Sequence, residues 1–443
     1  MELITTSKVV FTYKKRKDLA NKNMKLTSIN TAVAFALISV GLSQTAYTKT
    51  PSTNNVQLIQ EVAVLRSQGP RGLEKFLNTH AQELKNPSPQ MREALDKLCQ
   101  QRDCYASKLY WYTDLEQAKA AAKASNKPIL SLRLLGNLDQ DLSCANSRFF
   151  RVSLYPNKEI SQFLRDRYIL HWQSVRPVPK VTVDFGDGRK LERTLTGNSI
   201  HYILDNSGEP VDAIPGLYGP QAFLRQLVAG EKAVKEYTNS QDVVRAGFLR
   251  EYHRKQLAST QRQWGADLAK LGIKNLPRLV EMSDDNQTPN AAVAGTLAVT
   301  KMRVESPLLR NITSATNNQA ALQDITDSAT WQRIAQLYTK DAKLDNNSVA
   351  LIGSKRFQAD NLNNLQRVVG NFELAIALDT VRNEYTLHSK IHQWFMQGNE
   401  TNDVSALNEK VYSELFLTPS SDPWLGLMSS ESYSAIDNDG IRK

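Results

Sequence analysis

The chain has 443 residues, of which 41% are hydrophobic and 23% charged, and its formal net charge is +10. This length supports two or three domains with at least one substantial core, and the composition is that of an ordinary globular protein. Residues 1–46 hold seven basic and two acidic side chains, so +5 of the net charge lies there and +5 in the rest. That remaining excess is mild and forms no long basic run, which argues against a nucleic-acid partner.

The segment that starts at Met24 has the build of a secretory signal peptide. A positive start is followed by the eleven-residue apolar run Ala32–Leu42 and then by small and polar residues. The run is too short to cross a bilayer comfortably, and we place the cleavage site near Ala46. An uncleaved signal anchor is the alternative. Since no later apolar stretch could form a transmembrane helix, we expect a periplasmic or secreted protein with no membrane span after cleavage.

The three cysteines fit an oxidising compartment. Cys99 and Cys104 are close enough in sequence to close a small loop, and export favours a disulfide between them. Two free thiols or part of a metal site are the alternatives. Cys144 is then left without a partner, and an unpaired cysteine in an exported protein is buried, bonded to another chain or reactive.

Residues 47–106 predict a helical N-terminal segment after the extension and signal peptide of residues 1–46. Apolar residues recur at helical spacing from residue 56 up to Gly69, where the helix should stop. A second short helix is predicted over 89–99. The order of elements changes after this segment.

Strands and helices alternate through residues 107–230, which predicts an α/β layer with a mixed sheet. Thr113 and Glu116 have the spacing of a capping box at the start of one helix. The expected order is strand 108–113, helix 113–127, strand 128–136, helix 156–167, strand 168–175, a hairpin over 181–195 that turns at 186–188, two strands within 199–214 that turn at 206–208, and helix 219–230.

Residues 231–417 differ, because nearly all of their segments have helical periodicity. They predict a mostly helical C-terminal domain, followed by an irregular tail over 418–443. Gly272, Pro307 and Gly398 should act as helix stops. The expected helices cover 241–271, 290–305, 328–342, 361–397 and 403–416.

Residues 107–230 resemble the thioredoxin superfamily. The resemblance rests on a helix that ends in Asn-Lys-Pro-Ile-Leu at 126–130, a Cys-x-x-Ser at 144–147 that opens the next helix, and a closing strand, Asp-x-x-Gly turn, strand and helix over 202–227. It implies a fold class of α+β/α multidomain type: a thioredoxin-like α/β central domain joined to a mostly helical C-terminal domain.

Two departures from the thioredoxin pattern limit what the resemblance implies. The second cysteine of the family's active pair is Ser147 here, and Ser199 stands where the family has a cis-proline packed against the active disulfide. The hairpin 181–195 also occupies the place of a helix. An intramolecular two-cysteine redox cycle at this motif is therefore excluded, because the motif has no second thiol.

Cys144 keeps the position of the family's nucleophile, at the start of a helix. The helix dipole and free N–H groups would favour its thiolate, Arg148 would add to this effect, and Ser147 could donate a hydrogen bond. Such a monothiol site could form mixed disulfides. His201, which follows Ser199 on the next strand, could face this helix and pair with the thiol. We prefer the alternative in which Cys144 packs under the helix and His201 is structural.

Glu384, His388 and His392 recur every four residues in a predicted helix and therefore share one face. Two histidines at this spacing can bind a transition metal, with Glu384 as third ligand. We prefer a solvated helix face, because no His-Glu-x-x-His motif is present. The chain also has no glycine-rich phosphate loop, and we expect no cofactor.

Two functions compete on these grounds. The preferred hypothesis is a non-catalytic thioredoxin-fold protein that binds exported protein partners or acts as a scaffold, with the helical domain as partner surface. The alternative is a monothiol disulfide reductase or isomerase that acts through Cys144. An accessible Cys144 sulfur with a lowered pKa would favour the enzyme, and a buried sulfur would favour the binding protein.

Overall fold

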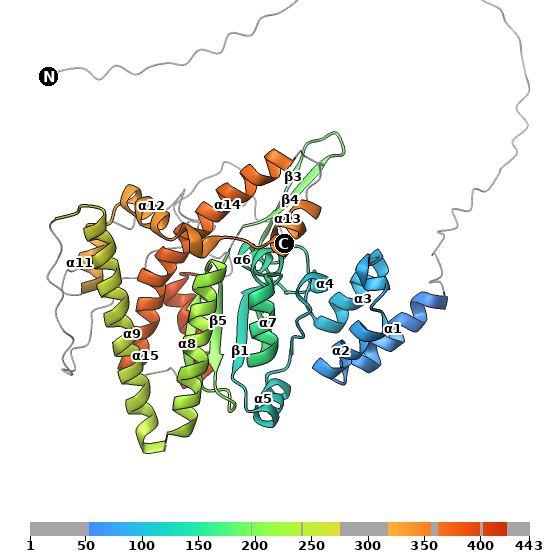
Figure 1. The fold of residues 1–443 in the computed structure, drawn as a ribbon, viewed down its shortest axis with the longest axis horizontal. Helices are drawn as coiled ribbons and strands as arrows, with labels where there is room; N and C mark the ends of the chain where they lie inside the picture. Colours follow the sequence, from blue (N-terminus) through green and yellow to red (C-terminus); the bar gives the residue numbers. More distant parts are fainter. Residues whose placement is uncertain are drawn as a thin grey trace, which may run out of the picture. The chain divides into compact units, whose positions relative to one another are not determined.

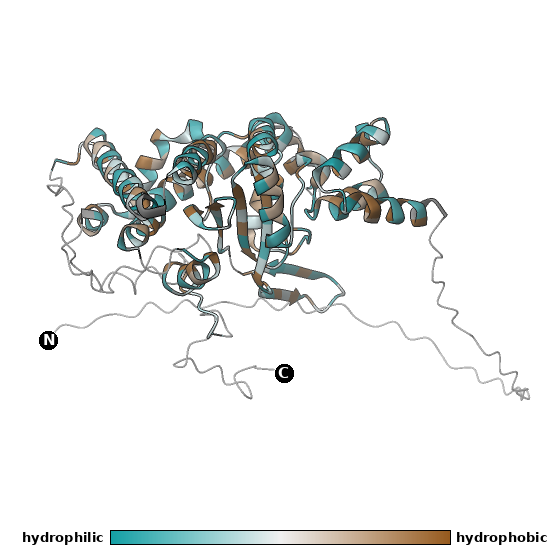
Figure 2. Ribbon diagram, turned by 90° about the horizontal axis from the view of Figure 1, so that it is seen from below, coloured by the Kyte–Doolittle hydropathy of each residue, from teal (hydrophilic) through white to brown (hydrophobic). Residues whose placement is uncertain are grey.

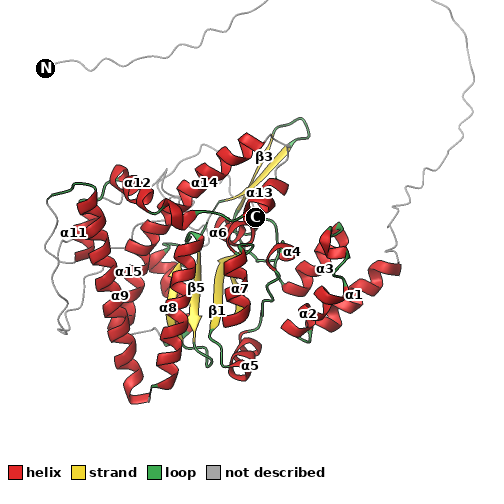
Figure 3. Cartoon of the chain, in the orientation of Figure 1, coloured by secondary structure: helices red, strands yellow, loops and turns green. Residues whose placement is uncertain are grey.

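The computed structural model describes residues 53–195, 197–240, 242–274, 318–355, 362–398 and 402–422. The predicted signal peptide, the helix expected over 290–305, the stop at Pro307 and most of the tail lie outside these ranges. Figure 3 shows that helices predominate around a small group of strands. Across the described ranges, no helix combines the length and apolar character that a bilayer span requires.

The central sheet has four strands, and it is mixed as the sequence predicts. Its order is β2-β1-β5-β6, with β1 parallel to β2 and the other neighbouring pairs antiparallel. Every residue of β1, β5 and β6 is buried, so the polar side chains of these mostly apolar strands, His201 and Asp212 among them, lie in the interior. The strands are β1 (Ile129–Leu135), β2 (Ile169–Arg176), β5 (Ser199–Leu204) and β6 (Pro210–Pro215).

The turn between β5 and β6 lies where the sequence predicts it. The Asp205 carboxylate accepts hydrogen bonds from the backbone N–H groups of Ser207 and Glu209, at 2.8 and 2.9 Å. Gly208 has φ 93°, a conformation that glycine adopts without steric cost. This tight turn sets the register of β6 against β5 and pairs Asp212 with Ile203.

Three helices expected beside the strands are present (Figure 1): α5 (Leu115–Ser125) precedes β1, α7 (Lys158–Arg167) precedes β2, and α8 (Pro220–Asn239) follows β6. The predicted capping box at Thr113 is wrong, because Asp114 is the N-cap and accepts a hydrogen bond from Gln117 N at 2.8 Å. The strand predicted over 108–113 is also absent, and its only ladder contact is an isolated bridge between Tyr112 and His171.

The hairpin expected over 181–195 is confirmed as a separate two-stranded sheet of β3 (Lys180–Asp184) and β4 (Lys190–Thr194). Gly186 and Gly188 have φ 75° and 91°, as its turn requires. Its residues are exposed except for Thr194. Figure 2 shows that the hairpin is more hydrophilic than the largely hydrophobic strands of the central sheet.

The N-terminal helices have a hydrophobic core of their own. Cys99 and Cys104 are both buried in it and are joined by a disulfide, with their Cα atoms 6.2 Å apart. Ser88 caps α3 by accepting a hydrogen bond from Met91 N. The helices are α1 (Thr53–Arg66), α2 (Pro70–Thr79), the 3₁₀ turn η1 (Glu83–Lys85), α3 (Pro89–Cys99) and α4 (Cys104–Ser107).

The C-terminal half is helical as predicted, with one long run from α14 through η5 to α15. Gly398 ends this run with φ 74°, as its predicted role as a helix stop requires. The described elements are α9 (Asp242–Lys270), α11 (Asn318–Asp324), α12 (Ser328–Leu337), η4 (Thr339–Ala342), α13 (Asn346–Ser354), α14 (Leu362–Arg382), η5 (Asn383–His388), α15 (Ser389–Gln397), α16 (Val404–Lys410) and η6 (Val411–Leu415).

One hydrophobic core extends from Leu109 to Phe416 and joins the sheet to the C-terminal helices. Strand β6 contacts both α8 and η5, and α15 packs along α9. The chain from Pro51 onward forms a single unit. The consequence for function is that β6, at one edge of the sheet, lies against helical residues more than 150 positions later in the sequence.

Candidate functional site

Cys144 is the N-cap of a short helix, α6 (Ala145–Phe149), that continues into the π-helical turn η2 (Phe150–Leu154). Its side chain is 0% exposed and belongs to the main hydrophobic core. The backbone N–H of Ser147 donates to Cys144 Sγ at 3.4 Å. Burial nevertheless raises the pKa of the thiol, which is the opposite of what a nucleophilic cysteine at a helix start requires.

The two serines named with this motif are also buried. The Ser147 hydroxyl donates to the Cys144 carbonyl oxygen at 3.0 Å, and its oxygen lies 2.6 Å from Ser143 Oγ. Ser199 begins β5, and its hydroxyl has no hydrogen-bond partner within the described part of the chain. Neither hydroxyl reaches solvent, so neither can contact a bound partner in this conformation.

His201 does not form the histidine–thiol pair with Cys144 that its position on the strand suggested. Its Nε2 lies 2.7 Å from Tyr155 Oη, and its ring packs against Phe150 and Phe223 with centroid separations of 4.6 and 5.0 Å. Burial lowers the pKa of His201 to about 3. It is therefore a neutral core side chain, as expected from the preferred interpretation in which His201 is structural.

A pocket of about 550 Å³ lies along α6 and faces the helical half of the protein. Helix α14 forms much of the opposite wall, and Gly197 and Asn198, just before β5, also contribute. Arg148 lines this pocket and is the one predicted binding residue that does so. The apolar lining includes Phe149, Leu217, Ile352, Val368, Phe372 and Phe416.

Asp379 and Arg382 add charge to this mostly apolar lining. Burial raises the pKa of Asp379 to about 7, and the positive charge of Arg382 opposes the shift only in part. Burial also lowers the pKa of Arg148. A carboxyl group with a raised pKa in an apolar pocket is typical of a ligand-binding or functional site.

Asp379→Asn should make stability less sensitive to pH. A carboxyl whose folded-state pKa is raised favours folding most at low pH, and this advantage is lost as pH rises toward about 7. Above that pH the wild type keeps a charge that the variant lacks. We therefore expect the variant to gain about 2 kcal/mol in unfolding free energy at pH 8 and little at pH 4. Urea unfolding at both pH values measures this, and equal effects at the two would contradict it.

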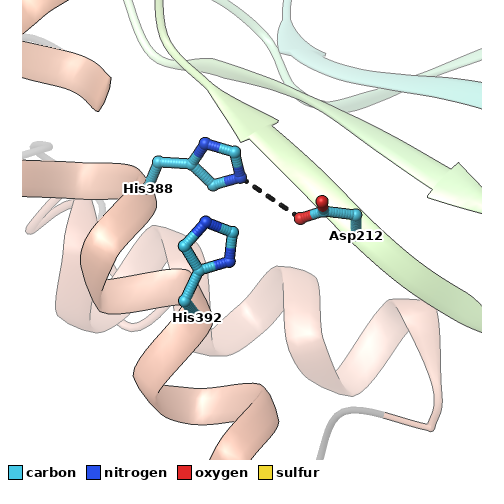
Figure 4. Close-up of side chains that lie close together, drawn as sticks. All are labelled: Asp212, His388 and His392. Atoms are coloured by element: carbon cyan, nitrogen blue, oxygen red, sulfur yellow. Dashed lines mark hydrogen bonds and ion pairs between the residues drawn. The ribbon is translucent and has the colours of Figure 1, made fainter. Parts of the chain in front are cut away.

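A second group of polar side chains lies where β6 meets η5 and α15. Asp212, His388 and His392 each offer a ligand atom, and these atoms all lie within 4.8 Å of one another. Figure 4 shows both imidazole rings turned toward the Asp212 carboxylate. All three residues are buried, so the solvated helix face that we expected for His388 and His392 is wrong.

Glu384 belongs to the same group but lies farther out, with 23% of its side chain exposed. His388 bridges two carboxylates, with Nδ1 3.3 Å from Glu384 Oε2 and Nε2 3.2 Å from Asp212 Oδ1. Burial opposes a charge on His388, but the charges of Glu384 and Asp212 raise its pKa to about 10. Burial would likewise raise the pKa of Asp212, yet the hydrogen bond and charge of His388 hold it well below its usual value.

Two further side chains complete the group, and no sequence pattern indicated them. Tyr252 Oη donates to Asp212 Oδ2 at 2.9 Å. His253 Nδ1 lies 2.8 Å from His392 Nδ1, and His253 Nε2 lies 3.0 Å from the Val211 carbonyl oxygen. Their only signal is the apolar periodicity of α9, which places Tyr252 and His253 in a helix without saying what that helix packs against.

Comparison with known proteins adds no relative to these observations. A search against models of protein families finds no match. No curated protein sequence matches the chain. The functional argument therefore rests on the fold, the pocket along α6 and the group of Asp212, His388 and His392.

Proposed function

We propose that this exported protein is a non-catalytic binding protein on a thioredoxin-like scaffold. The pocket along α6 receives an apolar side chain of an exported protein partner. The observation that carries this proposal is the complete burial of Cys144 beside that pocket. The position that would hold a reactive thiol is closed, while the surface next to it is open for binding.

The topology of the sheet supports the thioredoxin-like part of this proposal. The resemblance implies a strand, a helix opened by Cys144, a second strand, and a closing strand–turn–strand–helix unit. The chain contains these in order as β1, α6, β2 and the unit from β5 to α8. Strands β1, β2, β5 and β6 pair as one sheet. The β3–β4 hairpin is inserted between β2 and β5 in the sequence and forms a separate sheet.

The lining of the pocket supports binding of a mainly apolar group. Its volume of about 550 Å³ lies within the roughly 300–1,000 Å³ range of small-molecule sites. Phe149 and Phe372 both line it and contact each other edge to face, with ring centroids 5.9 Å apart. They form one continuous aromatic wall, and such a surface accepts apolar anchors. Arg148, Asp379 and Arg382 would orient the polar groups that flank such an anchor.

The monothiol alternative requires a partner disulfide to reach Cys144 Sγ. Thiol–disulfide exchange proceeds by direct attack of a thiolate on a sulfur atom, so both exposure and a thiolate are needed. Cys144 is 0% exposed and its pKa is raised. The geometry therefore favours binding over exchange.

Filling the pocket should abolish binding, whereas removing the thiol should not. Ala375 lines the pocket from α14, and Ala375→Trp would occupy it. Leu374→Trp is the matched control, because Leu374 is 51% exposed and does not line the pocket. We expect anilinonaphthalene sulfonate, an apolar anionic fluorophore, to bind the wild type and Leu374→Trp alike, and Ala375→Trp about tenfold or more weakly.

Partner capture from an exported protein fraction should follow the same pattern. Cross-linking should recover the same proteins with the wild type, Leu374→Trp and Cys144→Ser, and lose them with Ala375→Trp. Capture that disappears in Cys144→Ser and persists in Ala375→Trp would instead support the monothiol enzyme.

A further inference from the structure

We propose that Asp212, His388 and His392 bind a divalent transition metal ion of the Zn²⁺ type, which would join the edge of the sheet to the C-terminal helices. This inference is independent of the pocket along α6. It replaces Glu384, the third ligand that sequence spacing suggested, with Asp212 from β6. The starting observation is the convergence of three buried ligand atoms within 4.8 Å (Figure 4).

The ligand types select the class of metal. Two imidazoles and one carboxylate suit Zn²⁺ and neighbouring first-row ions, whereas Mg²⁺ and Ca²⁺ prefer oxygen ligands alone. An ion would lie between His388 Nε2 and Asp212 Oδ1, in place of the proton that joins them in a hydrogen bond of 3.2 Å. Binding would release this proton to solvent. His392 packs against His388 with ring centroids 4.1 Å apart, so its imidazole lies beside that position.

Each ligand is held by an outer partner, as in known metal sites. Glu384 accepts from His388 Nδ1, which directs His388 Nε2 toward Asp212. Tyr252 Oη and the backbone N–H of Ala213 both donate to the Asp212 carboxylate, at 2.9 and 2.8 Å. These contacts fix the orientation of the ligands before any ion arrives.

The second histidine is oriented by a chain of contacts that ends on the backbone. The Val211 carbonyl oxygen can only accept, so His253 Nε2, 3.0 Å away, carries the proton of that ring. The neutral His253 ring then accepts at Nδ1 from His392 Nδ1, at 2.8 Å. This assignment leaves a lone pair on His392 Nε2 that is available to a metal ion.

A pocket borders the outer side of this group at Glu384. Glu384 and Tyr385 line a pocket of about 540 Å³ whose other walls include Gln226, Gln256 and Thr260. Gln226 Nε2 donates to both Glu384 oxygens at 3.0 Å. Within this proposal, an ion from solvent would meet the partly exposed Glu384 before the buried His388, which Glu384 contacts.

The π-helical turn contributes to this geometry. His388 ends η5, and His392 lies one turn later in α15. Such turns within α-helices occur frequently at functional sites. Because Asp212 and His388 are 176 positions apart in sequence, a shared ion would tie β6 directly to the long helical run.

The test is a metal titration of the full chain after dialysis against a chelator. We expect the wild type to bind one equivalent of Zn²⁺, and Co²⁺ in the same site to give visible absorption bands that Zn²⁺ abolishes. Zn²⁺ should also raise the midpoint of thermal unfolding, because it binds only the folded state. His392→Gln should lose the stoichiometric binding, the Co²⁺ bands and the thermal shift.

Two further variants keep the test decisive if His392→Gln fails to fold. Glu384→Gln, at a partly exposed position, should keep the helical circular dichroism and weaken Zn²⁺ binding by roughly 10- to 100-fold. His80→Gln is the control, since His80 contacts Glu61 and Glu83 outside this group, and it should bind Zn²⁺ as the wild type does. Absence of binding to the folded wild type, or equal binding by Glu384→Gln, would reduce the group to a hydrogen-bonded core cluster.

Discussion

Cys144 in the native protein should react with iodoacetamide at least about a thousandfold more slowly than an exposed cysteine in the same chain. Its sulfur has no exposed surface and its pKa is raised by burial, so the native state offers neither access nor a thiolate. Reaction then requires opening of the core, and global opening of a stable domain costs about 5 kcal/mol or more. Quenched alkylation followed by peptide mass analysis measures the rate.

An exposed thiol elsewhere in the chain provides the reference rate. Ser125 is exposed near the end of α5, and Ser125→Cys should label at the rate of an ordinary thiol. Both cysteines should label equally fast in denaturant. Rapid native labelling of Cys144, with a rate that titrates below pH 8, would revive the monothiol enzyme and remove the main support for a binding protein.

Much of the α/β layer could be predicted from the sequence because its signals are local. The strands β1 and β5 are short apolar runs bounded by turn residues, and the β5–β6 turn follows from Asp205 and Gly208. The capping error at Thr113 has a local cause as well. Two adjacent residues can both cap a helix, and spacing alone does not show that Asp114 is the one used.

The polar sites could be predicted only in part, because they depend on contacts between distant segments. Helical spacing correctly placed Glu384, His388 and His392 on one face, but it could not show that β6 covers that face. When the residues on one face of a helix are polar, their spacing is the same whether that face is exposed to solvent or buried. The environment of Cys144 was ambiguous for a similar reason, since a helix start lowers a thiol pKa only where the sulfur is not buried in apolar surroundings.

Arg151→Ala should be among the most destabilising single substitutions in the described chain. The side chains of Arg151 and Asp103 form an ion pair that is almost fully buried. Arg151 Nη2 also donates to the Asp141 carbonyl oxygen at 2.8 Å, so one guanidinium ties the loop before α4 to η2. Removing one partner of a buried pair strands the other charge, and we expect a loss of about 3–5 kcal/mol in unfolding free energy. Urea denaturation measures this loss.

Two comparisons separate the buried pair from an ordinary charge effect. Lys97→Ala breaks an exposed helical pair with Glu93 and should cost only about 0.5 kcal/mol. The double variant Asp103→Asn/Arg151→Met should lose clearly less than the sum of the single losses, because neither charge is then stranded. Lys355 Nζ lies 2.7 Å from Asp103 Oδ1, so it compensates part of the Asp103 charge when Arg151 alone is removed. A loss in Arg151→Ala no larger than that of Lys97→Ala would mean that Lys355 compensates it fully. The Arg151 contact would then not hold the loop before α4 to η2.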